Sequence, residues 1–114
     1  MKLKDIEYFL PLMEKLQVSK VSRGKTEKQG FFQTYKEEKG NVARIKKRGV
    51  KNTTMTWHEK RISFIKRHLG AVKKNQEKFY ISGVPTRRTL SFYAWAYDPS
   101  PKDTKKYIKN VIKK

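Results

Sequence analysis

Lysine and arginine dominate the side chains of this sequence that are capable of chemistry, and their charge suits the binding of phosphate groups. Residues 39–74 contain twelve Lys or Arg and a single acid, Glu59, whereas residues 1–38 contain eight basic and six acidic side chains. The whole chain has a formal net charge of +19. Because concentrated charge creates a local field that attracts a polyanion, nucleic acid is the first partner to consider.

The basic residues fall into three groups. The first lies in a polar connection predicted over residues 41–55, and the second recurs at i, i+7 and i+14 along one outward line of a predicted helix. The third lies where another predicted helix begins, and there the exposed N–H groups and the helix dipole favour an anion. We predict that the following residues contact nucleic-acid phosphates: Arg44, Lys46, Lys47, Arg48, Lys51, Lys60, Arg67, Lys74, Arg87 and Arg88.

Two groups of residues allow two interpretations, one functional and one structural. Thr86, Arg87 and Arg88 suit a phosphate at a helix N-terminus, but an ordinary cap with two surface arginines has the same sequence. If both arginines lie beside the connection of residues 44–51, they extend its surface. Trp95 with Phe92 suits a platform for unpaired bases, although burial in a small core is the commoner use of a two-sided aromatic helix.

Catalytic groups are scarce. His58 and His68 have no neighbouring cluster of Asp or Glu that would complete a metal site. Metal-dependent nucleases need several converging carboxylates, and six of the ten acids lie in the first 38 residues. We therefore predict no enzymatic activity, no metal and no cofactor, while a metal-independent ribonuclease that uses a pair of histidines stays open as an alternative.

Helices are the elements predicted to position these side chains. Apolar residues within 3–16 recur at spacings of three and four, and Pro11 either kinks this helix or lies in the first turn of a second one. Residues 26–29 and 56–59 both have the pattern of a capping box, and each begins a helix. Gly40 is predicted to end the first of these two helices.

The helix that begins at Thr56 is predicted to bury one narrow stripe, which leaves the basic line outward. If Gly70 ends this helix one turn early, Lys74 leaves the basic line. The predicted buried stripe consists of His58, Ile62, Ile65, Leu69 and Val72.

Residues 86–97 form a further predicted helix that is apolar on both sides and therefore central. A last helix begins after Ser100 with a proline in its first turn and buries Tyr107, Ile108, Val111 and Ile112. Residues 79–81 are predicted to form a loop, because no partner strand is evident. The expected fold class is all-α, a single compact domain over residues 1–114 with four to five helices and a long basic loop at 41–55.

Composition agrees with this class. Hydrophobic residues make up 36% and aromatic residues 12% of the 114 residues, too much for a disordered basic tail. Cysteine is absent, which suits a reducing cytoplasm. The first residues resemble no secretion signal, and no apolar run approaches a membrane span, so no membrane association is predicted.

Several short motifs resemble a known protein family. They comprise Gly30-Phe31 with Tyr35 and Gly40-Asn41, then Lys60-Arg61 with Ser63-Phe64 and Arg67-His68, then Gly83 with Pro85-Thr86-Arg87-Arg88 and Trp95-Ala96-Tyr97 with Pro99. In these motifs the chain resembles a family of small basic proteins from phages, bacteria and large DNA viruses. That family has no assigned activity, so the resemblance implies a phage or viral context only. In that context, the expected location is the cytoplasm of the host cell or an association with a virion.

We expect the protein to bind nucleic acid, chiefly double-stranded DNA, through phosphate contacts with low sequence selectivity. One alternative is a phage or viral protein that binds an acidic host protein, and another is a structural component of a ribonucleoprotein or virion. A helix-turn-helix over residues 12–18 and 27–39 is disfavoured by the length of the intervening segment.

Overall fold

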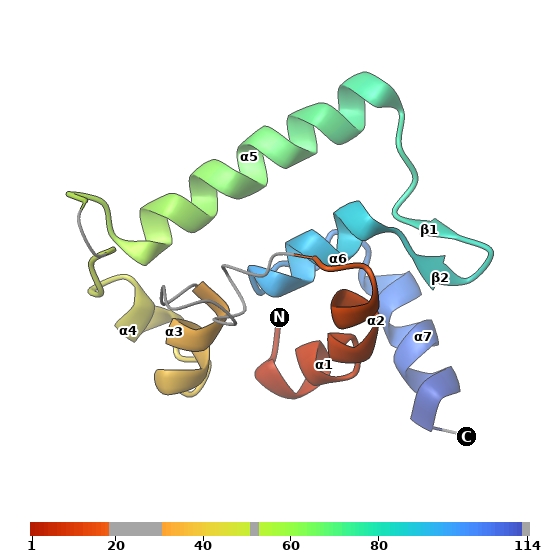
Figure 1. Cartoon of the computed structure of the whole chain (residues 1–114), viewed down its shortest axis with the longest axis horizontal. Coiled ribbons are helices and arrows are strands. Elements are labelled where there is room, and N and C mark those ends of the chain that lie inside the picture. Colours follow the sequence, from red (N-terminus) through yellow and green to blue (C-terminus); the bar gives the residue numbers. More distant parts are fainter. Residues whose placement is uncertain (19–30, 51–52, 113–114) are drawn as a thin grey trace.

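The computed structural model describes residues 1–18, 31–50 and 53–112, and these are mostly helical (Figure 1). The described part contains seven helices and one two-stranded antiparallel sheet. The fold is therefore mostly α, which corrects the prediction of a strictly all-α chain. The elements are α1 (Leu3–Glu7), α2 (Leu10–Lys15), α3 (Phe31–Glu37), α4 (Val42–Ile45), α5 (Trp57–Asn75), β1 (Tyr80–Ile81), β2 (Val84–Pro85), α6 (Arg87–Ala94) and α7 (Pro101–Ile112).

The N-terminal apolar pattern forms two short helices. Pro11 lies in the first turn of α2, where its missing N–H removes no helical hydrogen bond, so the second of the two alternatives is confirmed. Ile6, Phe9 and Met13 are fully buried. Leu16 lies beyond the end of α2 and is 41% exposed. The two helices thus supply one side of the hydrophobic core.

The segment from residue 31 to residue 50 is more helical than predicted. Gly40 ends the segment that follows α3 with φ +74°, and its N–H donates to the Tyr35 carbonyl at 2.8 Å, which confirms the glycine signal. Asn41 then caps α4, because its side chain accepts from the N–H groups of Ala43 and Arg44. The predicted loop 41–55 therefore contains a helix. The predicted capping box at residues 26–29 lies outside the described residues.

The prediction of a loop at residues 79–81 was wrong. Tyr80 pairs with Pro85 and Ile81 pairs with Val84, and Ser82 and Gly83 form the turn with φ of +53° and +76°. Two central residues with positive φ match the right-handed twist of a hairpin. Strands of two residues are too short to show an alternating pattern, so periodicity could not reveal them.

Helix α6 is central, as predicted. Leu90, Phe92, Tyr93 and Ala94 are fully buried, and Figure 1 shows α6 between α5 and the helices α1 and α2. Trp95 is 7% exposed and its ring stacks against Phe31 and Phe64, with centroids 5.0 and 4.8 Å apart. A buried, stacked ring offers no free face to a base, so the prediction of burial is confirmed.

Helix α7 begins with Pro101, as predicted, and packs on α6 through a polar contact. The Thr104 hydroxyl is buried and lies 2.5 Å from the Tyr93 hydroxyl and 2.7 Å from Asp98 Oδ1. Tyr107 stacks on Phe9, with ring centroids 5.1 Å apart. Ile112, which the periodicity placed inward, is 62% exposed, because the helix extends past the core at that end.

Candidate nucleic-acid interface

Helix α5 is the longest element and carries the whole of the predicted basic line. Thr56 begins it with a complete capping box, in which Thr56 Oγ1 accepts from the Glu59 N–H at 3.2 Å and Glu59 Oε1 accepts from the Thr56 N–H at 3.1 Å. The helix continues through Gly70 to Asn75. Lys74 therefore remains on the helix, together with Lys60 and Arg67.

The buried face of α5 is rotated relative to the predicted stripe. Trp57, Ile65 and Val72 are between 5% and 8% exposed, whereas Ile62, predicted to be inward, is 36% exposed. The buried side extends instead toward Arg61 and the rings of Phe64 and His68, which stack with centroids 4.0 Å apart. The predicted stripe was therefore wrong in its orientation, because a polar residue lies on the inner face of α5.

That residue is Arg61, which sequence reasoning missed. Its Nε donates to the Trp95 carbonyl at 2.6 Å, and its terminal nitrogen donates to the Ala96 carbonyl at 2.8 Å. Burial lowers the pKa of Arg61. The guanidinium thus satisfies carbonyls left open at the end of α6 and joins the two helices. No pattern in the sequence connects residues so far apart.

The outer face of α5 carries five exposed cations. Lys60, Arg67 and Lys74 are exposed, as the basic line predicted, and Lys66 and Lys73 join them. Lys60 also lies over the Trp57 ring, with Nζ 5.4 Å from the centroid. Glu59 is the one acid of α5, and its carboxylate is held in the capping box. At 1.5 Å per residue, the row from residue 60 to residue 74 is about 21 Å long. We call these five side chains the α5 row.

A second set of exposed cations lies close to the beginning of α5. Arg44, Lys46 and Lys47 are exposed, on α4 and just after it. The Trp57 N–H donates to the Arg48 carbonyl at 2.9 Å, and a bridge joins Gly49 to Thr56, so this end of α4 is tied to the first turn of α5. Lys51, predicted as a phosphate contact, lies outside the described residues.

Arg48 belongs to the same segment but has carboxylate partners. Its terminal nitrogen lies 3.0 Å from Glu37 and 3.1 Å from Glu38, at the end of α3. These ion pairs hold the connection against α3. The sequence predicted a phosphate contact at Arg48, and the neighbouring carboxylates compete with any phosphate for this guanidinium.

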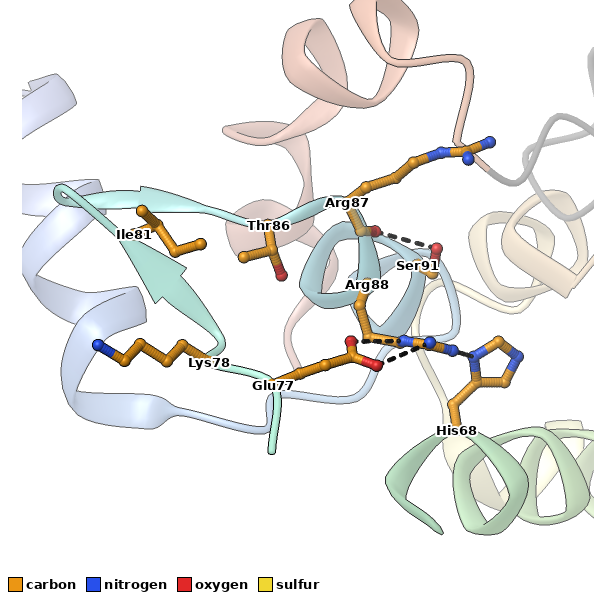
Figure 2. Close-up of a pocket in the computed structure, with 8 residues that line it drawn as sticks. All are labelled: His68, Glu77, Lys78, Ile81, Thr86, Arg87, Arg88 and Ser91. Atoms are coloured by element: carbon orange, nitrogen blue, oxygen red, sulfur yellow. Dashed lines mark hydrogen bonds and ion pairs between the residues drawn. The ribbon is translucent and has the colours of Figure 1, made fainter. Parts of the chain in front are cut away.

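Arg88 is also paired, within an open pocket of about 660 Å³ (Figure 2). Its Nε and one terminal nitrogen each lie 3.0 Å from a carboxylate oxygen of Glu77, and the other terminal nitrogen lies 2.8 Å from His68 Nδ1. Hydrogen bonds from Arg88 lower the pKa of Glu77. Burial and the charges of Arg88 and Arg67 lower the pKa of His68, which favours the neutral ring as acceptor. Arg88 therefore joins α6 both to His68 on α5 and to Glu77 in the segment that follows α5.

Arg87 differs from Arg88 in its direction. Figure 2 shows its side chain extending away from the Glu77 pair, and it is exposed. Thr86 caps α6, because its hydroxyl accepts from the Thr89 N–H at 3.3 Å. Figure 1 shows the beginning of α6 beneath the second half of α5, whereas α4 lies by the first turn of α5. The two arginines thus do not extend the surface formed by the described residues 44–50.

The histidines form no common centre. His58 and His68 are ten residues apart on α5, about 15 Å along the helix, too far for both to contact one phosphodiester. The described residues contain no group of three or more His, Asp or Glu that could hold a metal ion. The geometry of the described residues gives no support to the alternative of a ribonuclease with a histidine pair.

Comparisons of this chain with protein-family models, with curated proteins and with solved structures gave no match. Within the described part of the chain, no helix has the length and apolar character that crossing a membrane requires. The resemblance in short motifs stays a prediction, and the function has to be argued from the geometry of the site.

Proposed function

We propose that this protein binds double-stranded DNA through phosphate contacts with low sequence selectivity, in the phage or viral context that the motif resemblance implies. The observation that carries the proposal is the α5 row, five exposed cations on one continuous helix, with the exposed cations of α4 near its beginning. A polyanion with regularly spaced charges is the partner that such a row complements.

The dimensions of the row support a duplex. Its length of about 21 Å exceeds the width of the major groove, about 12 Å, so cations at its two ends reach phosphates on both sides of the groove. Lys66 to Lys74 supply one end, and Lys60 with Lys46 and Lys47 supplies the other. A single strand presents one phosphate run, and a row of this length contacts it less completely.

Low selectivity follows from the side chains on the outer face of α5. Base edges are distinguished by forked donors and acceptors such as Arg, Asn and Gln, whereas lysine acts as a point charge. Arg67 is the one exposed arginine of the α5 row, and the other four members are lysines. Most of the binding free energy therefore comes from the sugar-phosphate backbone.

Binding of a labelled duplex, measured by fluorescence anisotropy over a series of salt concentrations, tests the proposal. We expect the logarithm of the association constant to fall linearly with the logarithm of the salt concentration, with a slope of about −0.9 for each of roughly five to eight contacts. Two unrelated duplex sequences are expected to bind within about threefold of each other, and a single strand more weakly. The same measurement with duplex RNA of the same sequence compares the affinities of the protein for DNA and RNA.

Absence of duplex binding at about 50 mM salt, where phosphate contacts are strongest, would contradict the proposal. The acidic-protein alternative then becomes the better explanation of the α5 row, because it requires negative charge without a regular phosphate spacing.

A further inference from the structure

A glycine lies in the middle of the outward face of α5, where nothing within the described protein requires one. Gly70 is exposed and belongs to the helical run Trp57–Asn75. A Cβ built on Gly70 would meet no atom within 4 Å. Gly40 and Gly83 differ, because their positive φ values explain them. Since glycine weakens a helix interior relative to alanine, Gly70 calls for another explanation.

Four cations surround this glycine. On a helix surface, the neighbours of residue i are residues i±3 and i±4. For Gly70 these four positions are Lys66, Arg67, Lys73 and Lys74, and all four are exposed. The centre of this part of the α5 row is therefore bare backbone, with long cationic side chains on every side of it. We call this feature the Gly70 notch.

We propose that the Gly70 notch seats a backbone phosphate of the bound duplex. The inference rests on the proposed function and names the place on α5 where the sugar-phosphate backbone comes closest. A phosphate group placed over a residue without a side chain reaches the helix surface, and cations about 5 to 6 Å away at their Cβ atoms then reach its oxygens from both sides.

The role of the glycine is steric. The Gly70 N–H lies within the helix and is not a phosphate donor, so the glycine contributes space while Lys66, Arg67, Lys73 and Lys74 contribute charge. A larger side chain at position 70 would hold the phosphate away from the helix. The flexible lysines then compensate only in part, because each must extend further to make the same contact.

Substitution of Gly70 separates this inference from effects on folding. Gly70→Ala is expected to raise the unfolding midpoint by about 2 to 6 °C, because alanine favours the helix and meets no neighbour. The same variant is expected to bind the duplex about threefold more weakly, and Gly70→Leu about tenfold or more, with a salt slope smaller by about one. Weaker binding by a more stable protein excludes misfolding as the cause.

Asn110→Leu is the matched control, since it also adds a leucine to an exposed helical position, on α7. It is expected to bind the duplex like the unsubstituted protein. Anisotropy with the same labelled duplex at about 50 and 200 mM salt and thermal unfolding by circular dichroism provide the two measurements.

The outcomes distinguish the two proposals. If the unsubstituted protein binds the duplex and Gly70→Leu binds within twofold of it, the notch is not a phosphate seat, while the proposed function stands. Equal losses in Gly70→Leu and Asn110→Leu also overturn the inference, as does a lower unfolding midpoint in Gly70→Ala. If the unsubstituted protein fails to bind, the proposed function itself fails.

Discussion

Helices α5 and α7 both present lysines to solvent, but the surroundings of the two rows differ. Helix α5 carries five exposed cations beside those of α4, and its one acid is held in a capping box. Helix α7 carries four exposed lysines together with Asp103. An open pocket of about 370 Å³ beside the α7 lysines is lined by Asp5, Ile108 and Ile112 as well as by lysines. A carboxylate and apolar carbon thus interrupt the α7 row.

The number of charges therefore does not by itself define a phosphate-binding surface. Neighbouring acids lower the local potential, and exposed apolar carbon gains nothing from contact with phosphate. The arginine pairs make the same point within the predicted site. Arg48 and Arg88 count as two positive charges in the sequence, yet both have carboxylate partners in the fold.

The largest difference is expected between two variants that each lose four cations, one from α5 and the other from α7. Replacing Lys66, Arg67, Lys73 and Lys74 with glutamine is expected to reduce the salt slope of duplex binding by about three to four. Replacing Lys102, Lys105, Lys106 and Lys109 is expected to reduce it by less than about one, although the net charge changes equally. Anisotropy over a salt series measures both slopes. Equal reductions would mean that the protein attracts DNA by diffuse charge alone, without a defined surface.

The next effect in size concerns stability, and it comes from polar side chains on the inner faces of α5 and α7. Arg61→Leu on α5 is expected to cost about 2 to 3 kcal/mol, because two carbonyls at the end of α6 lose a charged donor. Thr104→Val on α7 is expected to cost about 1 to 2 kcal/mol through the loss of neutral hydrogen bonds. Chemical unfolding measures both values.

Arg67→Leu is the matched control, because it makes the same substitution on the outer face of the same helix. We expect its free energy of unfolding to change by about 0.5 kcal/mol or less, as is usual for surface positions. A larger loss for Arg67→Leu than for Arg61→Leu would reverse the assignment of the inner and outer faces of α5.

The smallest expected effect is a pH dependence of stability, which arises from the contacts of Arg88 with His68 and Glu77. The pKa of His68 is lowered in the fold by burial and by Arg88, so the unfolded chain binds its proton more readily. Stability from this group is fully present above the unfolded pKa of about 6.5 and is lost as the pH falls from there toward the lower folded pKa. The lowered pKa of Glu77 adds a loss below about pH 4.5, as this carboxylate is protonated and releases Arg88.

His68→Asn tests this prediction, because asparagine keeps an acceptor for Arg88 and does not titrate. The free energy of unfolding of His68→Asn is expected to vary less than that of the unsubstituted protein between about pH 5 and pH 7.5. Unchanged pH dependence in the variant would assign the titration to another group.

Much of the secondary structure was predictable because its signals are local. The capping box at residues 56–59, the prolines at positions 11 and 101 and the glycine at position 40 each act on residues within one helical turn, and each is confirmed. The central place of α6 was predictable as well, since a helix that is apolar on both sides has to be covered on both. The four cations around Gly70 could also be identified from the sequence, provided that the helix continues through Gly70, as it does in α5.

The tertiary structure alone decided how these elements meet. Arg61 counts as polar in any hydrophobic pattern, yet it lies inside because its carbonyl partners are 34 and 35 residues away, and this rotates the buried face of α5. The carboxylate partners of Arg48 and Arg88 lie ten or eleven residues away in sequence, and because of them both guanidinium groups are paired. Helix signals depend on neighbours three or four residues apart, whereas these contacts depend on the path of the whole chain.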